Sequence, residues 1–201
     1  MNLKLKDIII VSLLGVIGFV ISIVAGMAVG VFGIYGIFLN VSISSFLTAP
    51  IYFVMCHKIH KRGAIFIYYL LSGIIYAIVG FVPMIPVLIA AGLVGEIIIF
   101  KQENYTNNLQ ISISYVISQV VYALHGFFFI VFFGVSGIVE TFPNLFTEEK
   151  ATQIKNLFFN PMNMAIILGL EIIACILGVI FAKYINSKFF DKERQRGDVL
   201  S

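Results

Sequence analysis

The sequence predicts an all-α fold, a six-helix transmembrane bundle with the N- and C-termini in the cytoplasm. Of its 201 residues, 60% are hydrophobic and 11% are charged, and the mean hydropathy is +1.05. A soluble domain typically carries about 25% charged residues, because its surface faces water. Most of this surface is therefore expected to face hydrocarbon, and residues 1–201 are expected to form a single integral membrane domain.

Six apolar runs are predicted to be the membrane spans. A helix needs about 20 apolar residues to cross a bilayer, because the hydrocarbon core is about 30 Å thick. Backbone amides in lipid must bond within their own segment, so such runs are expected to be helical. The predicted spans are residues 8–30, 34–55, 64–82, 84–100, 109–133 and 162–182.

Lysine and arginine positions indicate the direction of the chain, because these residues are enriched in cytoplasmic segments. With the N-terminus inside, only Lys150 and Lys155 of the 13 Lys and Arg residues lie outside. An odd number of spans would remove this asymmetry. The cations flank apolar spans and do not form a basic patch, which disfavours nucleic acid as a partner.

The longest outer connection, residues 134–160, is predicted to contain a short amphipathic helix over residues 148–158. Thr147 can cap this helix, whose first turn carries two glutamates near the positive end of the helix dipole. Asn160-Pro161 then starts the last span as a cap followed by proline at the first helical position. Four apolar residues recur at helical spacing and form a stripe along this helix: Ala151, Ile154, Leu157 and Phe158. The helix is either a lid over the bundle or a surface helix that seals it.

Small residues form a stripe along the first span. In lipid, small side chains let helix backbones approach closely, which favours helix association. The stripe indicates either docking against another membrane subunit or packing within this chain. Its members, at steps of three and four, are Ser12, Gly15, Gly18, Ser22 and Gly26.

Polar and aromatic residues within the spans are the candidate binding residues. An ionisable group in mid-membrane costs about 2.5–3.5 kcal/mol on insertion scales and is by default a pointer to function. We expect an outward-facing pocket lined by Asn40, Tyr76, Tyr122, His125, Phe128, Asn163 and Glu171. The alternative is that His125 and Glu171 only satisfy each other or a backbone carbonyl. Glu96, near the cytoplasmic end of its span, is expected to be structural.

Motifs for catalysis and nucleotide binding are missing from the sequence. It contains no G-x-x-x-x-G-K-[ST] phosphate loop, no H-E-x-x-H zinc motif and no G-x-S-x-G elbow. The run from Cys56 to His60 is interpreted as a cytoplasmic anchor, because Lys58, Lys61 and Arg62 would repel a metal ion. No enzymatic activity, metal or cofactor is expected. The alternative is a small intramembrane enzyme that acts on lipid or prenyl chains, with Glu171 and His125 as acid and base.

Three short segments carry a resemblance to a known family. They are Lys4-Leu5-Lys6-Asp7 at the start of the first helix, Thr48-Ala49-Pro50 late in the second, and Gly92-Leu93-Val94-Gly95-Glu96 through Lys101. With six spans in about 200 residues, the chain resembles the substrate-binding S components of energy-coupling-factor (ECF) transporters. More narrowly, it resembles the Trep_Strep (MptS-like) group of bacterial integral membrane proteins.

The resemblance implies a function in uptake across the bacterial cell membrane. An S component captures a vitamin-like, tetrapyrrole or metal-chelate small molecule from outside. It docks through small residues of its first helix onto a membrane coupling (T) subunit that carries two ABC-type ATPases. The corresponding docking residues here are those of the small-residue stripe, and the lipid bilayer surrounds the complex.

Overall fold

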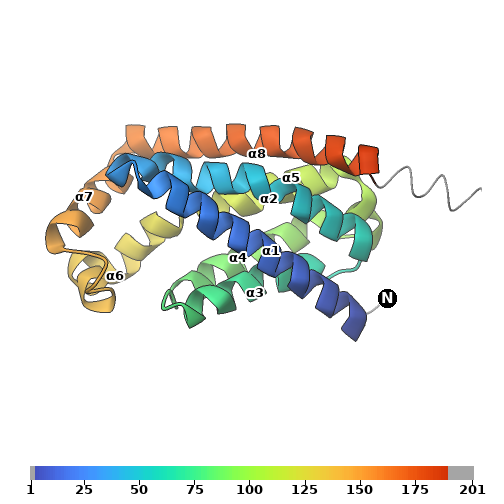
Figure 1. Ribbon diagram of the computed structural model, residues 1–201, viewed down its shortest axis with the longest axis horizontal. Coiled ribbons are helices and arrows are strands. Elements are labelled where there is room, and N and C mark those ends of the chain that lie inside the picture. The colour runs from blue at the N-terminus through green and yellow to red at the C-terminus, as the bar shows by residue number, and fades with distance from the viewer. Residues whose placement is uncertain (1–2, 190–201) are drawn as a thin grey trace, which may run out of the picture.

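A computed structural model describes residues 3–189, in which all regular elements are helices (Figure 1). This confirms the all-α prediction for the described residues. In chain order the elements are α1 (Leu5–Gly30), η1 (Gly33–Gly36), α2 (Ile37–Ile59), α3 (Ala64–Ile78), α4 (Met84–Ile99), η2 (Gln102–Thr106), α5 (Asn108–Ala123), α6 (His125–Thr141), α7 (Glu148–Phe159) and α8 (Pro161–Phe189).

Four helical stretches among the described residues are long and apolar enough to cross a membrane. They are α1, α2, the consecutive helices α5 and α6 taken together, and α8. The apolar helices α3 and α4 have 15 and 16 residues, fewer than the roughly 20 that a perpendicular span needs. The count of six spans and their orientation therefore stay predictions.

The predicted fifth span, residues 109–133, is divided in the structure. α5 ends at Ala123, Leu124 has φ −78° and ψ 0°, and α6 starts at His125. α6 also continues past the predicted end, through a kink at Gly134. Gly134 has a φ of +65°, which glycine adopts readily because it has no Cβ. The connection predicted from residue 134 is thus helical as far as Thr141.

The predicted helix in the outer connection is confirmed. α7 covers Glu148–Phe159, and the Thr147 hydroxyl accepts a hydrogen bond from the Lys150 amide at 3.3 Å. At the next boundary, the Asn160 side-chain oxygen accepts from the Met162 amide at 2.9 Å, and Pro161 is the first residue of α8. Both starts follow from local capping chemistry.

Small residues allow the central helices to pack closely. α8 runs along α2 for most of its length (Figure 1). A Cβ at Gly178 of α8 would lie 3.0 Å from the Phe46 backbone and from the Ala49 Cβ of α2. A Cβ at Gly95 of α4 would lie 2.7 Å from the Ser118 hydroxyl of α5. Such contacts let backbones associate within lipid, where the hydrophobic effect contributes little.

Glu96 joins three elements at the end of the bundle where α1 begins, as its predicted structural role requires. One carboxylate oxygen accepts from the amides of Gly63, Ile65 and Phe66, at 3.0, 2.9 and 3.2 Å. These amides belong to the start of α3, which lacks intrahelical acceptors for them. The other oxygen accepts from the Tyr105 hydroxyl at 2.6 Å. Burial, and then the Glu96 carboxylate, raise the pKa of Tyr105, so this hydroxyl keeps its proton.

An ion pair holds the start of α1 at the same end. The Lys61 ammonium and the Asp7 carboxylate are 2.5 Å apart, and their side chains are only 11% and 15% exposed. Asp7 also accepts a hydrogen bond from the Lys4 amide at 2.7 Å. The connection between α2 and α3 is thereby tied to the N-terminal helix.

Glu96→Ala is expected to lower the free energy of unfolding by about 2–3 kcal/mol, because it leaves buried donors unpaired. Thermal or denaturant unfolding in detergent measures this. Glu103→Ala is the matched control, because the Glu103 side chain is 75% exposed and lies 3.8 Å from Lys101. That change should stay within about 0.5 kcal/mol. Equal effects of the two substitutions would contradict the role assigned to Glu96.

Candidate functional site

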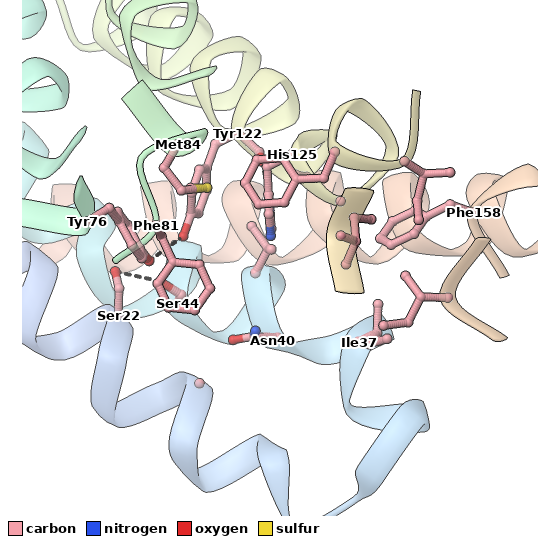
Figure 2. A pocket seen from close by; sticks show the side chains of 18 of the residues that line it. Ser22, Ile37, Asn40, Ser44, Tyr76, Phe81, Met84, Tyr122, His125 and Phe158 are labelled. Carbon is pink, nitrogen blue, oxygen red and sulfur yellow. Dashed lines mark hydrogen bonds between the residues drawn. The ribbon is translucent and has the colours of Figure 1, made fainter. Parts of the chain in front are cut away.

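A cavity of about 510 Å³ lies among the helices that carry the predicted binding residues (Figure 2). Small-molecule sites typically measure about 300–1,000 Å³. Its walls come from α1, α2, α5, α6 and α7, with single residues from α3, α4 and α8 and three from the connections. The aromatic members of the wall, apart from His125, are Tyr76, Phe81, Tyr122, Phe129, Phe142, Phe146 and Phe158.

Two hydrogen-bonded pairs of hydroxyls belong to the polar part of this wall, together with Asn40 and His125. The Ser44 hydroxyl donates to the Ser22 hydroxyl at 2.7 Å, which joins α2 to α1. The Tyr76 and Tyr122 hydroxyls are 2.9 Å apart and join α3 to α5 (Figure 2). Among the described residues that line the cavity, none is Asp, Glu, Lys or Arg.

His125 is fixed at the break between α5 and α6. Its Nδ1 lies 2.9 Å from the Tyr122 carbonyl oxygen, and its ring stacks on the Tyr122 ring with centroids 5.3 Å apart. A carbonyl only accepts, so Nδ1 carries the proton of this bond. In the neutral ring Nε2 is then an acceptor, and it has no hydrogen-bond partner among the described residues. Figure 2 shows this ring reaching into the cavity.

The structure brings four of the seven predicted binding residues together. Asn40, Tyr76, Tyr122 and His125 all line the cavity. Phe128, Asn163 and Glu171 do not belong to its lining. In these three cases the correct helix was identified, but the side chain faces another part of the molecule.

Glu171 lies inside the bundle with its side chain fully buried. One carboxylate oxygen accepts from the Ser45 hydroxyl at 2.6 Å and from the Cys175 thiol at 3.2 Å. His125 bonds instead to the Tyr122 carbonyl. The alternative in which His125 and Glu171 satisfy each other is therefore wrong, whereas the alternative of a backbone carbonyl partner holds for His125.

The small-residue stripe of α1 packs within the chain. Gly15 and Gly18 face α3, where a Cβ on Gly18 would overlap the Tyr68 hydroxyl. Ser22 bonds to Ser44 of α2, and a Cβ on Gly26 would lie 3.0 Å from the Asn40 side-chain oxygen. Ser12 is partly buried. This placement favours the packing alternative, and docking of a second subunit on these residues stays a prediction.

Of the wall that α6 and α7 supply, sequence reasoning identified His125 and, as one alternative, a lid helix, but not the other lining residues. α7 contributes Ala151, Ile154 and Phe158 to the lining. Their helical spacing was visible, but the surface that they cover was not. The Phe158 ring lies directly against Gly126 of α6, where a Cβ would overlap it. Helix α7 is thus part of the cavity wall.

Gly126→Ala is expected to displace the Phe158 ring and to lower the free energy of unfolding by about 1 kcal/mol or more, because overpacking forces neighbours to shift. The measurements are thermal unfolding and protease cleavage within α7, which should become faster. Gly169→Ala in α8 is the control, because no neighbouring atom lies within 4 Å of its added Cβ. Unchanged stability and cleavage in Gly126→Ala would contradict this packing.

Comparison with known proteins identifies a family. Residues 5–192 match the model of a family described as hypothetical bacterial integral membrane protein (Trep_Strep). Comparison with curated proteins and with solved structures gives no match. The match covers nearly the whole chain and agrees with the apolar helices of the structure. The protein therefore belongs to the Trep_Strep family of bacterial integral membrane proteins.

Proposed function

We propose that this protein is the substrate-capturing membrane subunit of an ATP-driven, ECF-type uptake transporter. Its cargo is a vitamin-like, tetrapyrrole or metal-chelate small molecule. The observation that carries the proposal is the cavity of about 510 Å³ with an aromatic wall, which one short amphipathic helix, α7, helps to close. Sites of this size and composition are typical of small-molecule binding.

The proposal requires partners that supply energy. The 201 residues contain no phosphate-binding loop, so ATP hydrolysis falls to other chains. The proposed partners are a membrane coupling subunit and two ABC-type ATPases. Membership of a bacterial integral membrane family is consistent with the bacterial cell membrane as the site of this assembly.

The alternative of an intramembrane enzyme finds no support in the geometry. It needs His125 and Glu171 to act on one substrate. Glu171 does not line the cavity, and its carboxylate is bonded to Ser45 and Cys175. An acid and a base must both reach the reacting group, by a direct hydrogen bond or through one water.

Protein purified from its native membrane is expected to retain a small molecule, which mass spectrometry of the extracted protein detects. His125→Ala should reduce the retained amount about tenfold, because the ligand loses a hydrogen bond and a ring contact. His60→Ala is the matched control, since His60 is an exposed histidine between α2 and α3. If the unmodified protein retains no small molecule, the proposed function is contradicted. If both variants retain equal amounts of the small molecule, His125 does not contribute to binding.

Capture from outside also requires α7 to face the exterior. Cys56 and Cys175 are fully buried, so an exposed cysteine introduced elsewhere can be labelled selectively. In intact cells, Lys150→Cys should react with a membrane-impermeant maleimide, whereas Arg62→Cys should react only after lysis. Both positions are exposed in the structure. The reverse pattern would place α7 in the cytoplasm and contradict capture from outside.

A further inference from the structure

A second, smaller cavity adjoins the one already described. It measures about 30 Å³ and lies between α1, α2, α3 and α5, with Leu88 of α4. The two cavities share four lining residues, which are the hydroxyl pairs Ser22–Ser44 and Tyr76–Tyr122. The hydrogen bonds of these pairs therefore form the boundary between the main cavity and this annex (Figure 2).

The annex is polar and has an unused acceptor. Gln119 of α5 lines it, is 5% exposed, and its side-chain oxygen has no hydrogen-bond partner among the described residues. Buried polar atoms in native proteins nearly always have a partner, because an unpaired one loses its hydration without compensation. The Tyr69 hydroxyl also lines the annex and likewise has no partner among the described residues. Gln119 and Tyr69 therefore point to a small polar group, able to donate a hydrogen bond to Gln119, that the described residues do not supply.

Size limits what this donor can be. About 30 Å³ is the share of one molecule in liquid water. A hydroxyl or an amine of a ligand fits such a space, whereas a carboxylate or phosphate with its counter-charge does not. The four boundary hydroxyls can each donate and accept, so they can bond to a group that enters between them.

The charge of the cavity lining further restricts the chemical class of the ligand. Neither cavity is lined by Asp, Glu, Lys or Arg among the described residues. A charged group buried there would find no opposite charge, and such burial is strongly unfavourable in a low-dielectric site. Nε2 of His125, an acceptor in the neutral ring, likewise favours a donor on the ligand.

We infer that the cargo is an uncharged molecule with a flat, mainly apolar body that carries a hydrogen-bond donor for His125, and with one small hydrogen-bond-donating end. The body occupies the main cavity against its aromatic wall, and the donating end reaches through the hydroxyl boundary to Gln119. This inference rests on the proposed function and narrows its ligand class. Molecules that would have to bury carboxylates or phosphates in the site are disfavoured.

Three probes that share one ring system test the inference. Naphthalene, 2-naphthol and 2-naphthoate differ only in a hydrogen, a hydroxyl or a carboxylate. Their binding is measured by equilibrium dialysis against the protein in lipid nanodiscs, and the uptake by empty nanodiscs is subtracted. We expect 2-naphthol to bind about fivefold more tightly than naphthalene, as one hydrogen bond contributes. We expect 2-naphthoate to bind most weakly.

The Gln119→Leu variant tests whether the annex causes the preference for 2-naphthol over naphthalene. It should make the affinities for 2-naphthol and naphthalene equal. Because the replaced oxygen is unpaired, Gln119→Leu should also unfold at the same temperature as the unmodified protein or at a higher one, so a folding defect does not confound the result. Gln110→Leu, in the same helix but outside both cavities, should keep the preference for 2-naphthol.

Three results would overturn the inference. They are 2-naphthoate binding as tightly as 2-naphthol, a preference for 2-naphthol that survives Gln119→Leu, and no binding of any probe. The second result would show that the hydroxyl of 2-naphthol does not bond to Gln119. The proposed function has its own test, because a charged molecule retained from the native membrane would refute this inference and leave substrate capture intact.

Discussion

Polar groups inside a bilayer must find their partners within the protein, because hydrocarbon offers no hydrogen bonds. This constraint accounts for the positions of Glu96 and Glu171. Glu96 accepts from three amides at the start of α3, and Glu171 accepts from Ser45 and Cys175. The Glu171 carboxylate joins α8 to α2, and the Glu96 carboxylate joins α4 to the start of α3. The polar residues therefore determine which helices are neighbours, and the small residues determine how closely they approach.

The helices pack closely along one part of the bundle and enclose a cavity at another. The glycines of α1, α4 and α8 bring backbones together along one part of the bundle. At the other end, Phe, Tyr and His side chains of several helices line the main cavity. Aromatic side chains also pack closely in the core, where Tyr52, Phe53 and Tyr115 are fully buried. The hydroxyl pairs lie between the two regions and connect α1 with α2, and α3 with α5.

Much of the fold could be predicted from sequence because its signals are local. Apolar runs gave the helices, and the caps Thr147 and Asn160 located the starts of α7 and α8. The break at Leu124 and the kink at Gly134 were not predictable, because the run around them is uniformly apolar and one glycine among many gives no signal.

The site was predictable only in part. Four of its polar residues were found because polar groups are rare in apolar spans. The positions of Phe128, Asn163 and Glu171 depend on how each helix is rotated about its axis, and apolar residues all around a helix leave that rotation unspecified. The part of the wall from α6 and α7 depends on the break that the sequence conceals.

The helices α6 and α7 form a hairpin that stands apart from the principal core. They pack chiefly on each other at one end of the molecule (Figure 1), and none of the buried residues in the largest hydrophobic cluster comes from positions 125–160. Two smaller clusters hold the apolar residues of the hairpin: one lies chiefly between α6 and α7, and the other packs α7 against Ile167 of α8 and Ile37 of α2. Swinging this hairpin about Leu124 and Asn160 would therefore uncover the cavity while the rest of the bundle stays folded, so opening costs less free energy than unfolding.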